Sequence, residues 1–232
     1  MAGANNKDSP PVGVEHGPLV VLYEDTRMLV VDKPSGLVVH PGACQDRTTA
    51  LHLARRLAGQ WVFPVHRLDR ATSGVLVFAL DAEAARELHT MFEDGRMAKT
   101  YLALVRGVAP ESGLIDHPIP RREDGPRVPA VTSFRRLWAG DHLSLVEAFP
   151  RSGRFHQVRR HLKHISHPLI GDANYGKGAL NREYRERFGL NRLALHASKL
   201  SFVHPFTNEP LTLMSPLPLD LARPFAAIGV VS

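Results

Sequence analysis

The chain has 232 residues, 44% of them hydrophobic, which is enough for one sizeable core. Lysine and arginine total 29 against 23 for aspartate and glutamate, and this net charge of +6 suits a polyanionic partner, although a solubilising surface would give the same total. The single cysteine, Cys44, excludes an intramolecular disulfide and a cysteine-rich metal site, and no apolar run approaches the roughly 18 to 20 residues that span a bilayer. We therefore expect a cytoplasmic protein that does not enter a membrane.

The N-terminal residues 1–18 are rich in Gly, Pro and Asn and contain no apolar run after a basic start. They predict a flexible tail rather than a signal peptide. A single domain over residues 19–232 is expected to follow. Its first elements are short apolar runs at residues 19–23 and 28–32, which predict two strands joined by a tight turn.

The next stretch of chain predicts a helix, a strand and a second helix. Residues 51–57 suit a short helix, and residues 74–80, rich in Val, Leu and Phe, suit a buried strand. Asp81 then stands where a helix N-cap is expected, and apolar side chains recur at helical spacing as far as Phe92.

Strands outnumber helices in the rest of the chain, and most connections are short. This pattern favours an antiparallel or mixed sheet over a doubly wound parallel one. We predict an α+β fold with a mixed, mostly antiparallel sheet flanked by helices and loops. The remaining predicted elements are strands at 101–105, 131–137, 143–149, 193–203 and 211–214, a charged loop at 121–129, and a helix with Phe155, Val158, Leu162 and Ile165 on one face.

Residues 66–70 (HRLDR) place Asp69 between Arg67 and Arg70, just ahead of a turn and the buried strand. Neighbouring cations favour the ionised form of a carboxyl group, which suits a nucleophile better than a proton donor. Taken alone, the same residues also suit an ordinary surface ion pair.

A second basic segment coincides with the helix predicted near residue 160. If its apolar side chains face the core, its cations gather on another side, where they would either hold phosphates or form a solvated face. Arg154 adds a donor near the helix start. The cationic side chains of the helix are His156, Arg159, Arg160 and Lys163.

Two further patterns are weak signals of a metal or nucleotide site. His161, His164 and His167 stand three apart, but Lys163 opposes a metal cation and no cysteine or carboxylate lies nearby to complete the ligand shell. Residues 171–178 (GDANYGKG) nearly match a phosphate-binding loop, with Gly178 where Ser or Thr would supply a magnesium ligand. We therefore expect neither a metal nor a cofactor.

Six motifs in order resemble the RluA family of pseudouridine synthases, over residues 19 to about 216. Residues 188–193 (FGLNRL) and 204–211 (HPFTNEPL) resemble the branch of that family that modifies tRNA. The six motifs are residues 32–37 (DKPSGL), 66–70 (HRLDR) with 72–74 (TSG), 99–101 (KTY), 153–159 (GRFHQVR), 167–172 (HPLIGD) and 195–197 (LHA).

The resemblance implies the pseudouridine synthase fold, with a central catalytic cleft and no cofactor. Tyr101, which by itself suits either strand packing or stacking on a flat ligand, becomes the ring that packs on the target base and handles its C5 proton. Asp69 becomes the catalytic aspartate, Arg159 the guanidinium that pairs with it, and Arg67 the side chain that fills the space left by an extruded nucleotide. The other expected RNA contacts are Arg70, Arg154, His156, Arg160 and Lys163.

The resemblance also implies a structured RNA substrate, in the tRNA branch a T-stem uridine at about position 65. Ribosomal RNA remains an alternative target, and a non-catalytic RNA-binding protein would share the charge pattern. We expect a monomer with no obligate protein partner and without the S4-type RNA-binding domain that many relatives carry ahead of the catalytic domain. Phe155 and Arg160 depart from the family pattern, which bears on RNA contacts.

Overall fold

The computed structural model describes residues 19–41, 48–121 and 125–230, so the predicted tail at 1–18 and Cys44 lie outside the described residues. The described helices are α1 (Ala50–Ala58), α2 (Ala82–Glu93), α3 (Gln157–His164), α4 (Gly178–Phe188) and α5 (Leu219–Ile228). The described strands are β1 (Val20–Glu24), β2 (Met28–Lys33), β3 (Phe63–Pro64), β4 (Ser73–Ala79), β5 (Ala98–Arg106), β6 (Ser112–Asp116), β7 (Ile119–Pro120), β8 (Arg127–Val128), β9 (Val131–Ala139), β10 (Leu143–Pro150), β11 (Leu195–Val203) and β12 (Pro210–Met214).

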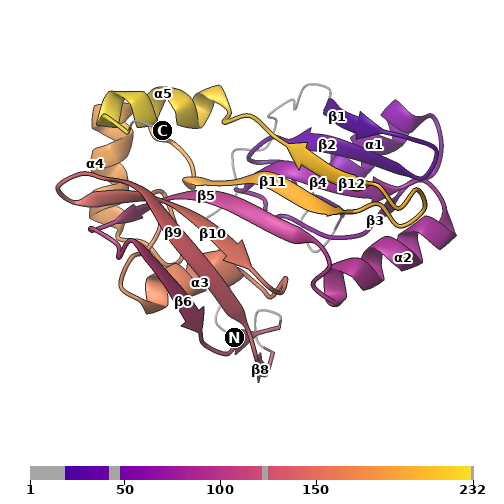
Figure 1. Ribbon diagram of the computed structural model, residues 1–232. Coiled ribbons are helices and arrows are strands. Elements are labelled where there is room, and N and C mark those ends of the chain that lie inside the picture. The colour runs from indigo at the N-terminus through magenta and orange to yellow at the C-terminus, as the bar shows by residue number, and fades with distance from the viewer. Residues whose placement is uncertain (1–18, 42–47, 122–124, 231–232) are drawn as a thin grey trace, which may run out of the picture.

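One 10-stranded sheet runs through the molecule in the order β1-β2-β4-β11-β5-β10-β9-β6, with β3 paired to β4 and β12 to β11. Within the described residues its strand pairs are antiparallel except β4 with β11, which is parallel. The predicted mixed, mostly antiparallel sheet is therefore confirmed. Figure 1 shows the earlier strands at one end of this sheet and β5, β10, β9 and β6 at the other.

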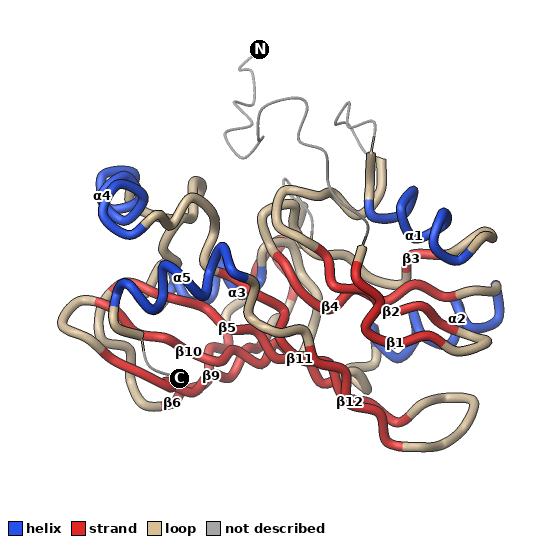
Figure 2. The backbone as a smooth tube through the Cα atoms, turned by 90° about the horizontal axis from the view of Figure 1, so that it is seen from above, coloured by secondary structure: helices blue, strands red, loops and turns tan. Residues whose placement is uncertain are grey.

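The first half of the sheet is built around β4, whose seven residues are all buried. Side chains of a strand alternate between its faces, so an unbroken apolar run requires cover on both sides. Leu76 and Phe78 pack in one core cluster with α1, while Val75 and Val77 pack in another with α2. Figure 2 shows α1 and α2 together at this end of the molecule.

The second half of the sheet is also covered on both faces. On one face Val146 packs with Val158 and Leu162 of α3, and on the other Leu145 packs with Tyr184 of α4 and Phe225 of α5. Helix α3 packs on β9 and β10, and the first residues of this helix share a cavity with the loop that precedes β4.

The parallel contact between β4 and β11 determines where that loop lies. Ser73 pairs with His196 and Gly74 with Ala197. Gly74 has a φ of +117°, and a Cβ atom there would lie 2.2 Å from the carbonyl oxygen of Ala197. Only glycine permits this approach. The TSG and LHA motifs therefore meet here and hold the start of β4 directly after the Asp69 turn.

Local contacts confirm the predicted cap of α2 and show how α1 begins and ends. Asp81 is the N-cap of α2, where its carboxylate accepts hydrogen bonds from the backbone N–H groups of Glu83 and Ala84. Thr49 caps α1 in the same way through its hydroxyl, and Gly59 ends that helix in the left-handed conformation.

Other sequence predictions are wrong in detail. The helix predicted to include Phe155 begins only at Gln157, because His156 takes a left-handed φ of 53° and breaks the helical path before it. The charged loop at 121–129 contains β8, which pairs with β7, and its residues 122–124 lie outside the described part of the chain.

Two helices carry no strong sequence signal. Helix α4 is strongly charged and buries a single side chain, Tyr184. Helix α5 contains Pro224, which costs a helix one backbone hydrogen bond, yet it persists because Leu221 and Phe225 are buried against the sheet. Tertiary packing outweighs local propensity in both elements.

Candidate active site

A cavity of about 160 Å³ lies where the loop before β4, strand β5 and the N-terminal end of α3 meet. It brings together residues that are far apart in the chain but were all predicted from sequence to act in one site. The predicted residues on its wall are Arg67, Asp69, Tyr101, Arg154, His156 and Arg159.

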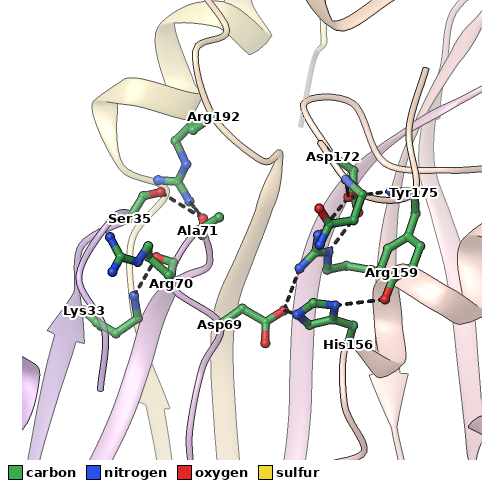
Figure 3. Close-up of polar contacts among 11 residues, drawn as sticks. Lys33, Ser35, Asp69, Arg70, Ala71, His156, Arg159, Asp172, Tyr175 and Arg192 are labelled. Carbon is green, nitrogen blue, oxygen red and sulfur yellow. Dashed lines mark hydrogen bonds and ion pairs between the residues drawn. The ribbon is translucent and has the colours of Figure 1, made fainter. Parts of the chain in front are cut away.

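Asp69 lies in a tight turn in which its carbonyl oxygen accepts a hydrogen bond from the N–H of Thr72 at 3.1 Å. Its carboxylate points into the cavity, and its side chain is 25% exposed. Oδ2 accepts a hydrogen bond from Nη1 of Arg159 at 3.2 Å, so the predicted pairing of these two residues is confirmed. Figure 3 shows Asp69 between two groups of polar residues, with its carboxylate directed toward α3.

Arg159 is itself held by a second carboxylate, that of Asp172. Its Nε and Nη2 donate to the two oxygens of Asp172 at 2.8 Å each, and both side chains are almost completely buried. Burial alone would lower the pKa of Arg159, but hydrogen bonds and charge from Asp172 and Asp69 raise it instead. The guanidinium therefore stays charged and oriented, with its Nη1 directed to Asp69.

Sequence reasoning placed Arg159 on a cationic stripe, and the structure corrects this, since Arg159 points into the protein while Arg160 and Lys163 lie nearer its surface. Asp172 was not singled out at all. Its available signal was its place in the HPLIGD motif, which was quoted only for resemblance.

The segment that resembled a phosphate-binding loop serves Asp172. The backbone N–H groups of Asn174 and Tyr175 donate to Oδ1 of Asp172 at 3.0 Å each. In a phosphate-binding loop such amides face the ligand. Here the amides donate to the carboxylate of Asp172 instead of a ligand. The nucleotide-binding interpretation is therefore wrong for these residues.

His156 lies beside Asp69 rather than on an outer RNA-binding face. Its Nε2 is 3.7 Å from Oδ2 of Asp69, and its Nδ1 makes a 3.0 Å hydrogen bond with the hydroxyl of Tyr175. Burial lowers the pKa of His156 to about 4, even though Asp69 opposes this shift. The imidazole is therefore neutral at pH 7 and lies against the carboxylate as a polar, uncharged neighbour.

Tyr101 lies on β5, where its ring contacts two core clusters and forms part of the cavity wall. Burial and the negative charge of Asp69 raise the pKa of its hydroxyl group. Tyr101 therefore carries its proton at neutral pH. A flat ligand in the cavity would meet an aromatic ring and an O–H donor rather than a phenolate.

The cations around the cavity differ in their surroundings. Arg67 is exposed, and Arg154 is half-buried with no acceptor for its Nε among the described residues. The guanidinium of Arg160 and the ammonium of Lys163 lie 5.2 and 5.6 Å from the ring centre of Tyr175, outside the cavity wall. Arg67 and Arg154 therefore contribute positive charge to the cavity wall itself, whereas Arg160 and Lys163 place theirs beside Tyr175.

Behind the Asp69 turn lie two buried cations that sequence reasoning did not identify as site residues. Lys33 is fully buried, and its Nζ donates to the carbonyl oxygens of Leu37 at 2.7 Å and Arg70 at 3.2 Å. Nη2 of Arg192 donates to the carbonyl of Ala71 at 3.3 Å and to the hydroxyl of Ser73 at 2.8 Å. The carbonyl oxygens of Arg70 and Ala71, the two residues that follow Asp69, therefore each accept a hydrogen bond from a buried cation, as Figure 3 shows.

Arg70 supports the site through its backbone carbonyl, which accepts the hydrogen bond from Lys33. Its carbonyl oxygen also accepts the N–H of Gly36 at 2.8 Å. This links the DKPSG and HRLDR motifs directly. Arg70 does not line the cavity, so its predicted RNA contact has no support in the cavity wall.

The histidines considered as metal ligands have other partners. His161 is buried and bonds to Thr132 and to the carbonyl of His117, while His164 stacks on the ring of His117. In residues 19–41, 48–121 and 125–230, no three His, Cys, Asp or Glu side chains are arranged to hold a metal ion. Within the same ranges no helix is long and apolar enough to cross a membrane.

Comparison with known proteins gives consistent matches. Residues 27–164 match the family model described as RNA pseudouridylate synthase. The chain is 40% identical over 222 residues to tRNA pseudouridine synthase C of Vibrio cholerae, covering 86% of this chain and 91% of that one. It is 39% identical to the protein of the same name from Salmonella typhimurium, covering 86% and 85%. Among solved structures, human RNA pseudouridylate synthase domain containing 4 superimposes with a TM-score of 0.76 at 28% identity, covering 90% of this chain and 93% of that chain.

Proposed function

Since this chain belongs to the RNA pseudouridylate synthase family, we propose that it converts a uridine of tRNA to pseudouridine in the cavity that contains Asp69. The family resemblance inferred from the six motifs is confirmed, and with it the assignment as an isomerase acting on RNA. In the reaction the bond from N1 of uracil to C1′ of ribose breaks and a bond from C5 to C1′ forms. The proton lost from C5 is balanced by the one gained at N1, so no co-reactant is consumed.

The observation that carries the assignment of Asp69 is its pairing with a buried, pre-oriented guanidinium. A nucleophilic carboxylate must be ionised and poorly hydrated, and these demands conflict unless a partner charge is held nearby. Arg159 meets both demands, because Asp172 holds it by two hydrogen bonds and leaves its third toward Asp69. The neutral His156 lies 3.7 Å from the same carboxylate and adds no charge there.

Tyr101 and Arg67 are proposed to hold the target nucleotide outside the RNA stack. Extruding a base costs a few kcal/mol. Stacking on the ring of Tyr101 and insertion of the exposed Arg67 into the gap would offset this cost. Because Tyr101 keeps its proton, we propose that its hydroxyl relays the C5 proton only by giving up its own in the same step.

The RNA backbone is proposed to bind across the cationic opening. Arg154, Arg160 and Lys163 supply charges on the α3 side of the cavity, and phosphate contacts of this kind position RNA without reading its sequence. The names of the similar bacterial proteins support tRNA as the substrate. We further propose a T-stem uridine as the target, a single catalytic domain over residues 19–232, action in the cytoplasm and a monomeric state.

The test compares wild type with Asp69→Asn on unmodified bulk tRNA and on bulk ribosomal RNA, with pseudouridine mapped by chemical labelling and reverse transcription. We expect a modified tRNA uridine with wild type and none with the variant. Asp141→Asn, an exposed carboxylate in the β9–β10 turn, is the matched control and should act like wild type. If only ribosomal RNA were modified, the proposed tRNA substrate would be wrong and ribosomal RNA would be the substrate. Tight RNA binding without any product would favour a non-catalytic RNA-binding protein.

A further inference from the structure

A second recess adjoins the Asp69 cavity and is larger, about 590 Å³ against 160 Å³. The two hollows share part of their walls, including Arg67, Tyr101 and Arg154. The second recess extends from these shared residues toward α2, which contributes Phe92 and Glu93. A ligand that fills the first hollow and continues past Arg67 or Arg154 therefore enters the second.

The inner wall of this recess is electropositive. Lys99 is partly buried there, and its Nζ donates only to the carbonyl of Ser152, at 3.1 Å, among the described residues. Burial and the charge of Arg154 lower the pKa of Lys99 to about 8. Arg154 in turn has a buried Nε with no acceptor in the described part of the chain. Two neighbouring cations that have no carboxylate partner within residues 19–41, 48–121 and 125–230 suit an anion between them.

Another part of the recess wall is aromatic. The ring of Phe92 stacks on that of His66 with centroids 4.2 Å apart. Nε2 of His66 accepts the backbone N–H of Val77, and burial lowers the pKa of this imidazole to about 3, so the stack is uncharged. An uncharged aromatic surface beside a pair of cations matches the two parts of a nucleotide, its base and its phosphate.

We propose that this recess holds the nucleotide next to the target uridine in the RNA chain, with the linking phosphate at Lys99 and Arg154 and the neighbouring base against the stack of Phe92 and His66. The proposal rests on the proposed function, because the occupant is continuous with the nucleotide in the Asp69 cavity. None of the steps proposed for catalysis uses Lys99 or Phe92. The recess is thus a substrate-binding subsite, and it gives the enzyme a means of sensing the nucleotide that flanks its target.

The first arm of the test measures RNA affinity after loss of the cation. Lys99→Gln should weaken binding of an unmodified tRNA transcript about tenfold, as expected for one charge-assisted phosphate contact. It should also reduce the slope of log Kd against log salt by about one. The loss of affinity should exceed any loss in the rate of a single turnover at saturating RNA. Lys99→Met, which keeps the apolar stem, should give the same result and guards against misfolding of the first variant.

The matched control is Lys199→Gln. Lys199 lies opposite Thr100 on the neighbouring strand β11, so it shares the sheet face of Thr100, whereas Lys99 is on the other face. The control removes the same charge from the same region but from outside the recess, and the salt slope should stay at the wild-type value. Equal affinity and equal slope for wild type, Lys99→Gln and Lys99→Met would overturn the phosphate assignment.

The second arm tests the base with RNAs that are abasic immediately 5′ or 3′ of the target uridine. One of the two should bind wild type about tenfold more weakly, since stacking of a base on an aromatic ring is worth roughly that much. Phe92→Leu keeps the apolar packing of α2 and should weaken intact RNA similarly, with no further loss on the abasic RNA. If the losses of affinity from Phe92→Leu and from the abasic site were independent and additive, the base assignment would be overturned. If wild type forms pseudouridine in no RNA, the proposed function fails, while these affinities still decide whether the recess binds a nucleotide.

Discussion

Replacing either of the two carboxylates that contact Arg159 should lower both stability and activity, but Asp172 should matter more for stability and Asp69 more for activity. Asp172 is completely buried and makes two hydrogen bonds of 2.8 Å to Arg159, which is only 3% exposed. Replacing Asp172 by Asn leaves a buried guanidinium without its main counter-charge and turns an amide N–H toward existing donors. Removing one partner of a buried ion pair costs about 3 to 5 kcal/mol. For a chain of this length that corresponds to a fall in Tm of about 6 to 20 °C.

Asp69→Asn should be much milder for folding. Asp69 is 25% exposed and contributes one 3.2 Å hydrogen bond, and Arg159 would keep both contacts to Asp172. The expected cost is about 1 to 2 kcal/mol, the range of one hydrogen bond to a charged group. Pseudouridine formation should nevertheless disappear completely, because the proposed nucleophile is gone.

The assay is thermal and urea unfolding of Asp172→Asn, Asp69→Asn and the control Asp141→Asn, together with single-turnover pseudouridine formation below the lowest Tm. Asp172→Asn should be the least stable of the three and should react slowly, since Arg159 is then poorly oriented. If Asp69→Asn were the less stable protein, or if the Tm of Asp172→Asn equalled that of wild type, the support of Arg159 by Asp172 would be refuted.

The same pair predicts a pH dependence. Arg159 and backbone N–H groups lower the pKa of Asp172 below its ordinary 3.8, against the opposing effect of burial. A carboxyl with a lowered pKa in the folded state stabilises the protein above its unfolded pKa, and this contribution is lost as the pH falls through the folded value. Wild type should therefore lose more stability than Asp172→Asn when the pH is lowered below about 4, as urea unfolding at each pH would show.

Three further predictions concern single side chains. Gly74→Ala should prevent stable folding, because its Cβ would lie 2.2 Å from a β11 carbonyl oxygen at a φ of +117°. Gly59→Ala, whose Cβ would have nothing within 4 Å, should lower the free energy of unfolding by only about 1 to 2 kcal/mol. Circular dichroism distinguishes the two outcomes. Tyr101→Phe keeps the ring and should leave RNA affinity unchanged while slowing single turnover at least about tenfold; an unchanged rate would show that the ring alone suffices. Arg192→Lys keeps the charge but cannot reach Ala71 and Ser73 together. Amide hydrogen exchange in the Asp69 turn should therefore become faster, and kcat should fall without a change in KM. Equal exchange rates in both proteins would show that Arg192 does not support that turn.

Much of the fold could be predicted because local signals agreed with the tertiary structure. The N-cap at Asp81 and the buried run of β4 correspond to a real cap and a central strand. Where the local signal was weak or opposed, prediction failed. Helix α5 contains Pro224, and the start of α3 depends on the left-handed backbone of His156, which no local preference indicates.

The candidate site, like the fold, was predictable in some respects and not in others. By itself the sequence determined which residue types the site would contain, because ordered motifs such as HRLDR and KTY name Asp69 and Tyr101 without any coordinates. The family resemblance also named Arg159 as the partner of Asp69, but only the tertiary structure decided the geometry of that contact and its support by Asp172. Asp69 and Arg159 are 90 residues apart, and their contact depends on how β4 and β11 pair and on where α3 packs. Asp172 acquires its role in the same way, since the buried charge of Arg159 requires a counter-charge that only packing can place beside it.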